Sequence, residues 1–537
     1  MRKVLILSLI ACLIGFEGYS QNIDKTKLDA YFDTLAKNDK FMGSVAVSHN
    51  GELIYTKSVG FSDIEKGLKA NEDTKYKIAS ISKTFTAVLI FIAIDEGILN
   101  PDQTIDKFFP EINNAEKITI SHLLYHRSGI FDDNSYTDYT NQPETTQETL
   151  ERITNAQTDF EPGTKARYGN VNFILLSYIL EKIYQKSFPE ILEEKITKPT
   201  GLKNTYCVNN VNNDACKSYK YVWEIEHGNN EYSWESEPEI DLSVLLGAVG
   251  IASNAVDLVL FSDALFNGKL ISDHSLQQME TIKDGYGMGL MQIPFGNRTG
   301  FGHSGNIDAF SSIFVHFPDS KVSFALTANG LNYNRDHIAY VVLSTVYNMS
   351  FEIPEFGSLA YNLTDDELEQ YVGIYSNEQI SGKITVIRIN NQLFGAMTDS
   401  YVPLKAVGKN KFVFEDEGIV LEFNPVNRSM IFMQGGQTVS LIRVSNPEFN
   451  TTLTNEDLDK YLGVYLSEQI TIKITIIKAY HKLFAHVTGR NSLMLLETTE
   501  KDKFEFAEEG IILEFNQNNK TLVVKQGNRI LSFIRKD

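Results

Sequence analysis

The last third of this 537-residue chain carries one pattern twice, and this duplication constrains the fold more than any other feature. The motif Tyr371-x-Gly373-x-Tyr375 recurs about 90 positions later as Tyr461-x-Gly463-x-Tyr465, and Phe412-Val413-Phe414 recurs as Phe504-Glu505-Phe506. Both copies consist of short alternating segments separated by glycine and asparagine turns, which is typical of small antiparallel β-domains. We therefore predict two homologous domains, each a β-barrel of eight strands, over residues 363–445 and 453–537.

The preceding residues, 21–350, are enough for one larger domain with a mixed α+β pattern. Two alternating segments flank Asn50-Gly51, a pair typical of a two-residue hairpin turn. The segments Phe310 to Val315 and Val322 to Leu326 also alternate, which predicts paired strands of an antiparallel sheet. Residues Val171 to Tyr184 have the apolar spacing of an amphipathic helix. The sequence thus predicts an antiparallel sheet accompanied by helices.

The N-terminus resembles a secretory signal peptide over residues 1–20. Arg2-Lys3 precedes an apolar run that is too short to span a bilayer, and small residues follow before Gln21. Leu9 to Cys12 also resembles a lipoprotein cleavage box, but the chain stays apolar after Cys12, so we prefer cleavage near Ser20. These features predict a secreted or periplasmic protein with no transmembrane segment in the mature chain.

Composition excludes several classes of function. The chain has 69 acidic and 49 basic side chains and a net charge of −20, which argues against binding to nucleic acid or to anionic membranes. It contains no zinc-type Cys/His spacing, phosphate-binding glycine loop or dinucleotide motif. Cleavage near residue 20 would leave Cys207 and Cys216, which are able to form a disulfide in an exported chain but equally to remain two thiols.

The stretch Ser80-Ile81-Ser82-Lys83 is the first candidate for chemistry. On a helix, residues three apart lie on one face, so the Lys83 amine can reach the Ser80 hydroxyl. A lysine activates a serine only where its surroundings keep it partly neutral, and the apolar run after Lys83 supplies such surroundings. A helix N-terminus at Ser80 would also favour an oxyanion. The alternative is a capping serine beside a solvated lysine.

Two further stretches carry candidate residues. Tyr168-Gly169-Asn170 lies on a predicted loop before a helix, so both polar side chains are able to point into one cleft, although a buried tyrosine with a capping asparagine would look the same. His303-Ser304-Gly305 lies on a predicted edge strand of small residues, which would allow a substrate backbone to approach closely. A lone histidine such as His303 is usually structural.

Together, Ser80-x-x-Lys83, Tyr168-Gly169-Asn170 and His303-Ser304-Gly305 resemble the three motifs of serine β-lactamases and penicillin-binding-protein-type hydrolases. The resemblance covers roughly residues 25–350. It implies an α+β fold, in which an antiparallel sheet is flanked by helices and accompanied by an all-α subdomain, followed here by the two small β-barrels. The third motif has His where most β-lactamases have Lys, which is typical of the esterase and D-amino-acid peptidase branch, and a hydrolase followed by two barrels is similar to D-aminopeptidases.

The resemblance also implies roles for single residues. Ser80 would attack an amide or ester carbonyl, Lys83 and Tyr168 would share general-base work, and the backbone N–H groups of Ser80 and Asn306 would form the oxyanion hole. The residues implied in substrate binding are Asn170, His303, Ser304 and Gly305. No metal or organic cofactor is needed.

The function that we predict is an exported serine hydrolase that cleaves a small peptide, a D-amino-acid derivative or a cell-wall fragment through a Ser80 acyl-enzyme. Two alternatives remain, a true β-lactamase and a catalytically silent binding or scaffold protein with the same fold. The partner would be a small-molecule or short-peptide substrate. The sequence leaves open whether the scissile bond is an amide or an ester, and it does not set the oligomeric state.

Overall fold

The protein is described from a computed structural model. The structure describes residues 23–536 with gaps at 133–144, 209–213, 227–228, 239, 355, 357–362, 378–381, 415–416, 435–436, 450–452, 468–471, 489, 491 and 528, and it describes only the backbone at 223–226, 229–232 and 529. The predicted signal peptide, residues 1–20, with the alternative cleavage site at Cys12, lies outside the described residues.

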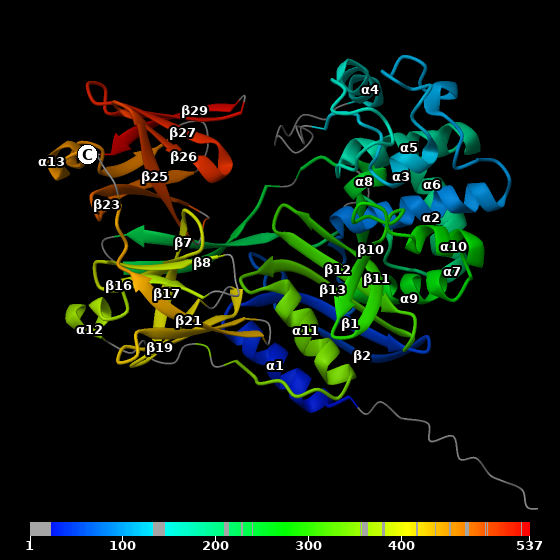
Figure 1. Cartoon of the computed structure of the whole chain (residues 1–537). Helices are drawn as coiled ribbons and strands as arrows, with labels where there is room; N and C mark the ends of the chain where they lie inside the picture. The colour runs from blue at the N-terminus through cyan, green and yellow to red at the C-terminus, as the bar shows by residue number, and fades with distance from the viewer. Residues whose placement is uncertain are drawn as a thin grey trace, which may run out of the picture.

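A six-stranded antiparallel path in the order β10-β11-β12-β13-β1-β2 forms the centre of the N-terminal part (Figure 1). Its strands are β1 (Phe41–His49), β2 (Glu52–Val59), β10 (Met291–Phe295), β11 (Arg298–Ile307), β12 (Phe310–Phe317) and β13 (Val322–Leu331). The predicted hairpin joins β1 to β2, and both turn residues, Asn50 (φ 54°) and Gly51 (φ 79°), have the positive φ angles that a type I′ turn requires. β11 was predicted to be an edge strand, which is wrong for its first half, because β10 pairs with Arg298 to Gly302.

Alternating residues of β1 supply two separate cores. Val45 and Val47 point into a core shared with α1 (Lys25–Lys37) and α11 (Arg335–Val346). Ala46, between them, belongs to a larger core on the opposite face, which is built mainly from the helical subdomain and α9 (Ala255–Phe266). The sheet is therefore covered by helices on both faces.

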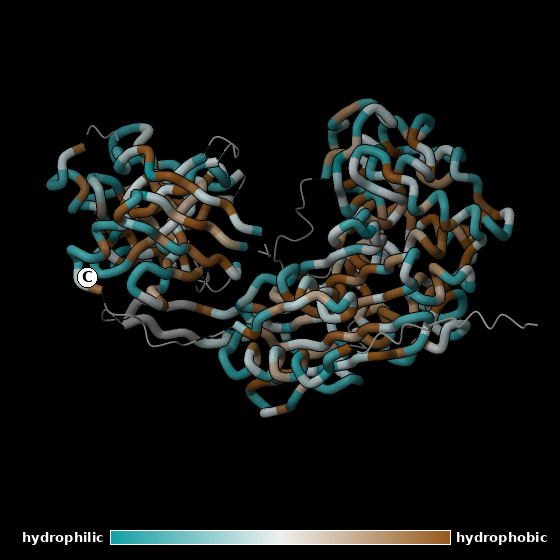
Figure 2. Tube along the Cα trace, turned by 60° about the horizontal axis from the view of Figure 1, so that its bottom comes forward, coloured by the Kyte–Doolittle hydropathy of each residue, from teal (hydrophilic) through white to brown (hydrophobic). Residues whose placement is uncertain are grey.

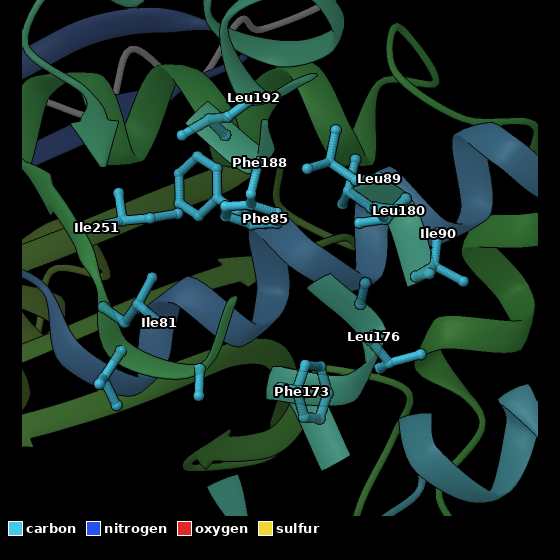
Figure 3. Close-up of a cluster of buried hydrophobic side chains, with 14 of the residues drawn as sticks. Ile81, Phe85, Leu89, Ile90, Phe173, Leu176, Leu180, Phe188, Leu192 and Ile251 are labelled. Atoms are coloured by element: carbon cyan, nitrogen blue, oxygen red, sulfur yellow. The ribbon is translucent and has the colours of Figure 1, made fainter. Parts of the chain in front are cut away.

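The helical subdomain is organised around α2 (Ser82–Asp95), the helix that follows the first motif. Nearly every residue of α2 is buried, so its side chains pack on all sides, and Phe85 stacks on Phe261 with ring centroids 3.8 Å apart. Figure 3 shows this core between α2 and α5. The surrounding helices are α3 (Ile120–Leu124), α4 (Thr146–Asn155), α5 (Asn170–Tyr184), α6 (Phe188–Leu192), α7 (Lys198–Thr200), α8 (Leu246–Val249) and α10 (Asp273–Glu280).

Further strands of the N-terminal part lie outside the six-stranded path. A three-stranded sheet in the order β5-β9-β6 lies beside the first motif, and β7 joins β13 through one parallel pair, Tyr219 with Gly330. The bounds of these strands are β3 (Phe61–Asp63), β4 (Leu68–Lys69), β5 (Tyr76–Lys77), β6 (Tyr206–Cys207), β7 (Tyr219–Glu226), β8 (Asn229–Ser236) and β9 (Ile251–Ser253). Cys207 and Cys216 are both buried thiols and do not form a disulfide with each other.

The duplicated region forms two closed eight-stranded antiparallel barrels, and the predicted fold class is thereby confirmed. In each barrel the first strand pairs with the last, β14 with β21 and β22 with β29. The first barrel contains β14 (Gly373–Ser376), β15 (Ile384–Ile389), β16 (Gln392–Ala396), β17 (Ser400–Gly408), β18 (Lys411–Phe414), β19 (Ile419–Asn424), β20 (Ser429–Gln434) and β21 (Gln437–Ser445). The second contains β22 (Gly463–Leu466), β23 (Lys473–Ala479), β24 (Lys482–Val487), β25 (Leu493–Glu500), β26 (Lys503–Phe506), β27 (Ile511–Asn516), β28 (Thr521–Gln526) and β29 (Arg529–Lys536). Helices α12 (Asp365–Glu369) and α13 (Asn455–Asp459) precede the two barrels.

The two barrels contact each other and the N-terminal part. β17 pairs with β25, and an apolar cluster that includes Phe394 and Phe484 fills the space between the barrels. The Asn334 amide, just before α11, donates a hydrogen bond of 2.8 Å to the Glu417 carboxylate of the first barrel.

Apolar residues gather in the interior of the N-terminal part and in the interior of the barrel region (Figure 2). Among the described helices, none has the length and apolar content needed to cross a bilayer.

Candidate active site

Ser80 lies in a short 3₁₀ turn, Ala79–Ile81, that connects β5 to α2. The sequence predicts that Ser80 begins the helix, but α2 begins at Ser82, because Ala79 has a φ of +49° and turns the backbone before the helix. Ser80 is half-buried, whereas Ser82 is fully buried and its hydroxyl accepts a hydrogen bond of 3.1 Å from the Ile251 backbone N–H. Ser82 therefore has a structural partner, and Ser80 is the serine that is open to a substrate.

The Lys83 ammonium has three hydrogen-bond acceptors around it. Its Nζ lies 3.0 Å from Ser80 Oγ, 2.7 Å from Asn170 Oδ1 and 3.0 Å from the Ala248 carbonyl oxygen. The side chain is fully buried, and this desolvation lowers the pKa of Lys83 to about 7, although the charge of Asp132 acts in the opposite direction. The neutral amine is therefore accessible near pH 7.

A neutral Lys83 amine fits these acceptors in one particular way. It has two N–H donors and one lone pair, and two of its three neighbours, the Asn170 amide oxygen and the Ala248 carbonyl oxygen, are able only to accept. Ser80 Oγ is the neighbour that also carries a proton. The lone pair is thus left for the Ser80 hydroxyl, which is the arrangement that a general base requires.

Tyr168 completes a triangle with Ser80 and Lys83. Its hydroxyl is hydrogen-bonded to the Ser80 side chain, and Lys83 Nζ lies 4.9 Å from the centroid of its ring. Burial raises the pKa of Tyr168 well above its usual value, so the phenol keeps its proton at neutral pH. In the resting site Tyr168 is therefore a proton donor, and Lys83 is the group able to accept a proton.

Two buried residues that the sequence analysis did not identify hold the Tyr168 loop. His126 packs on Tyr168 with ring centroids 4.4 Å apart, and its Nδ1 accepts a hydrogen bond of 3.3 Å from the Gly169 N–H. Asp132 Oδ2 accepts a hydrogen bond of 3.0 Å from the Val171 N–H in the first turn of α5. Burial and the charge of Lys83 hold the pKa of His126 far below its usual value, so its ring is neutral.

The third motif passes directly beside the Ser80 turn. A Cβ atom at Gly305 would lie 2.3 Å from the Ile78 carbonyl oxygen and 2.9 Å from the Ser80 nitrogen, so only glycine fits there. Ser312 donates a hydrogen bond of 2.9 Å to the same Ile78 carbonyl and fixes the contact. Asn306 follows Gly305 with an exposed side chain, whose Oδ1 accepts a hydrogen bond from Ser311. The roles of the Ser80 and Asn306 N–H groups in an oxyanion hole stay a prediction.

His303 is buried and neutral. Its Nδ1 lies 2.6 Å from the Ser304 carbonyl oxygen, which is able only to accept, so Nδ1 carries the proton. Burial, together with the charge of Lys83, lowers the pKa of His303 to about 4. Its ring centroid is 6.3 Å from that of Tyr168, and Ser304 beside it is half-buried. The structure thus brings all three motifs to one place, but the individual roles that the resemblance implies remain predictions.

A buried ion pair links the first and third motifs behind the site. Lys77 Nζ lies 3.9 Å from Asp308 Oδ2, and each side chain is only 2% exposed. Lys77 belongs to β5, three residues before Ser80, and Asp308 occupies the turn after β11, two residues past Asn306. The pair therefore ties the turn that carries Ser80 to the strand beside it. Over the part of the chain that the structure describes, no group of three His, Cys, Asp or Glu side chains is placed to hold a metal ion.

Comparison with solved structures shows the fold. The octameric penicillin-binding protein homologue from Pyrococcus abyssi superimposes with a TM-score of 0.55 at 20% identity, covering 88% of this chain and 100% of that one. A D-amino acid amidase from Ochrobactrum anthropi SV3 in complex with L-phenylalanine amide superimposes with a TM-score of 0.53 at 22% identity, covering 60% of this chain and 99% of that one.

Comparison of sequences gives the family. Penicillin-binding protein 4* of Bacillus subtilis (strain 168) is 26% identical over 325 residues, which are 56% of this chain and 71% of that protein. A teichoic acid D-alanine hydrolase of Staphylococcus aureus (strain MRSA252) is 30% identical over 179 residues, which are 33% of this chain but only 43% of that protein. The Beta-lactamase family model matches residues 28–344, more than half of the chain. The chain therefore belongs to the beta-lactamase family of serine hydrolases.

Proposed function

We propose that this protein is an exported hydrolase that cleaves an amide or ester bond of a small D-amino-acid derivative, a short peptide or a cell-wall fragment through an acyl-enzyme on Ser80. One observation carries the proposal: a desolvated Lys83 amine with a pKa of about 7 lies 3.0 Å from the Ser80 hydroxyl. A base with a pKa near the working pH gives the best combination of available neutral form and proton affinity.

The acylation step follows from these protonation states. As Ser80 Oγ bonds to the substrate carbonyl carbon, its proton passes to the neutral amine of Lys83, and negative charge develops on the carbonyl oxygen. The N–H groups of Ser80 and Asn306 would stabilise that oxygen, and one such donor is worth about 10²–10³-fold in rate. The tetrahedral intermediate then expels an amine or alcohol that takes the proton of Tyr168, and the ammonium of Lys83 returns a proton to Tyr168.

Deacylation uses the same base. A water molecule takes the place of the departed leaving group and gives a proton to the neutral form of Lys83 as it attacks the acyl carbon. The Ser80 oxygen then leaves and recovers its proton from the same amine. Lys83 is thus the base in both halves of the reaction, and Tyr168 is needed in addition as the acid that protonates the leaving group during acylation.

The substrate class rests on the third motif and on the relatives. His303 is neutral at pH 7 and offers no fixed positive charge, which favours neutral acyl groups over those with a carboxylate beside the scissile bond. The names of similar proteins include a teichoic acid D-alanine hydrolase and a D-amino acid amidase. A small D-aminoacyl group is the chemistry that these names share, and we extend it to this chain.

The proposed location rests on residues 1–20 alone. Their basic start, short apolar run and small residues are typical of a cleaved signal peptide, so we propose that the mature enzyme is secreted or periplasmic. Expression of the full chain with a mass measurement of the exported product tests this. The expected product begins near Gln21, whereas a lipid-modified product that begins at Cys12 would contradict it.

A labelling experiment and a substrate panel test the activity. A fluorophosphonate should modify Ser80 in the mature protein, and the label should be lost in Ser80→Ala but kept in Ser82→Ala. D-alanyl p-nitroanilide should be hydrolysed with a kcat/KM at least about tenfold above that of its L-alanyl counterpart, which is 1.4 kcal/mol of discrimination. A protein that is not labelled would be a silent scaffold, and one that prefers nitrocefin would be a true β-lactamase.

A further inference from the structure

The first barrel contains a cavity of about 380 Å³ at the end of the barrel where β16 and β18 terminate. This volume lies within the range of small-molecule sites, which is about 300–1,000 Å³. Most of the residues that line it are apolar, and apart from Met397 the apolar ones come from six strands of one barrel. The lining includes Ile384, Gly395, Ala396, Met397, Val402, Leu404, Phe414, Ile419, Leu421 and Phe432.

The second barrel provides an internal comparison for this cavity. Gly395 pairs with Val402 in the first barrel, and the equivalent pair in the second barrel is Ala485 with Met494. Both replacements are larger, and Met494 is buried where Val402 is only half-buried. Ile419 is likewise half-buried at the cavity, whereas its counterpart Ile511 is buried. The same fold thus carries larger side chains at these positions in one copy and a cavity in the other.

The rim of the cavity is polar and includes one acidic group. The polar residues of its lining are Thr398, Ser400, Ser492 and Glu417, and the side chain of Glu417 is exposed. Among the described lining residues there is no Lys, Arg or His, and the chain as a whole carries a charge of −20. An anionic head group at this rim would therefore be repelled, whereas a neutral or cationic one would find hydrogen-bond acceptors.

Met397 adds a further apolar surface at the rim. It directly follows β16 and is 61% exposed, so a flexible thioether side chain lies open to solvent beside the cavity. Such side chains adapt to apolar ligands of varied shape. Because a methylene group occupies about as much space as a water molecule, roughly 30 Å³, the cavity has room for an apolar chain of about ten carbons.

We propose that the first barrel binds the apolar part of a neutral or cationic amphiphile, with a chain of about ten carbons or an aromatic system of equal size in the cavity and the polar head at the Glu417 rim. This site is separate in its residues from the Ser80 site and does not depend on the proposed hydrolysis. Because the Glu417 carboxylate also accepts a hydrogen bond from Asn334, the head group would lie beside the contact between the barrel and the catalytic domain.

Fluorescence titration of the full chain with N-phenyl-1-naphthylamine, a neutral apolar probe, tests the site. The probe should bind with micromolar affinity, and 1-decanol should displace it at a concentration at least threefold lower than decanoate. Absence of any fluorescence enhancement, or equal displacement by decanoate, would overturn the proposal.

Two variants and one control locate the binding. Val402→Met introduces the side chain that the second barrel carries at this position and should weaken probe binding at least tenfold. Val426→Met changes an exposed valine and should leave it unchanged. Glu417→Gln can still accept the hydrogen bond from Asn334. It should remove the difference between the concentrations of 1-decanol and of decanoate that displace the probe. Unchanged binding in Val402→Met, with a normal melting temperature, would place the probe elsewhere and refute the assignment.

Discussion

The pH dependence of acylation provides the sharpest test of the catalytic geometry. Lys83 can act as the proposed base only when it is neutral, and its pKa is lowered to about 7 by burial. For a single group with this pKa, the neutral fraction is about 1% at pH 5 and about 90% at pH 8. The value of kcat/KM, which reports groups of the free enzyme, should therefore rise about 90-fold between these pH values and level off above pH 8.

Three other groups at the site, His303, His126 and Tyr168, titrate outside this interval. The pKa of His303 is lowered to about 4, that of His126 is held far below its usual value, and that of Tyr168 is raised well above it. The rise should therefore follow a single ionisation. Stopped-flow measurement with a p-nitrophenyl ester between pH 5 and 9, corrected for the background hydrolysis of the ester, gives the profile.

Asp132→Asn supplies the second arm of this test. The charge of Asp132 raises the pKa of Lys83, and the asparagine amide oxygen can still accept from the Val171 N–H. Removal of the charge should shift the midpoint of the profile to lower pH. A flat profile, a wild-type midpoint near the ordinary lysine value of about 10.4, or an unchanged midpoint in Asp132→Asn would each refute the assignment of Lys83 as the base.

Three further outcomes are expected. Tyr168→Phe should lower kcat/KM for a p-nitroanilide at least about 10²-fold but lower that for a p-nitrophenyl ester less, because the nitrophenolate leaves without a proton. Equal losses for the two substrates would contradict the role of Tyr168 as proton donor to the leaving group. The kcat/KM for nitrocefin should be about tenfold to hundredfold below that of the best ester or amide, since neutral His303 offers a substrate carboxylate no charge-assisted hydrogen bond. The reverse order, measured on one enzyme preparation, would contradict this reasoning. Lys77→Met should lower the free energy of unfolding by about 3–5 kcal/mol in a urea titration, because it leaves Asp308 as a buried charge without this partner. Lys77→Met combined with Asp308→Leu should recover part of the loss. An unchanged free energy of unfolding in the single variant would show that the pair contributes little.

Features with a local cause were predictable from the sequence. The turn at Asn50-Gly51 and the helix after Tyr168 follow from turn chemistry and apolar spacing, and α5 begins and ends within one residue of the prediction. The barrels were predictable because each copy repeats the same turns and aromatic positions. The three motifs could be located because each combines unusual residue types within a few positions.

Features that depend on packing between distant segments were not predictable. His126 and Asp132 look like ordinary polar residues in the sequence, and only the burial of their loop against α5 places them beneath Tyr168. Nothing in the sequence marks Lys77 and Asp308 as buried, since charged residues are usually exposed, and their burial follows from the contact between β5 and the turn after β11. The start of α2 was misplaced by two residues because the positive φ of Ala79 has no local sign in the sequence.

The pairing of β1 with β13 has a consequence for how the enzyme assembles during synthesis. Val45 lies opposite Leu326, about 280 residues away along the chain, and the Ser80 turn is packed against Gly305 and Ser312. Contacts of such long sequence separation form late, because the entropy of closing the intervening chain must be overcome first. A nascent chain that has not yet reached Leu331 lacks a partner strand for β1, so the hydrolase should remain inactive until its whole catalytic domain has been synthesised.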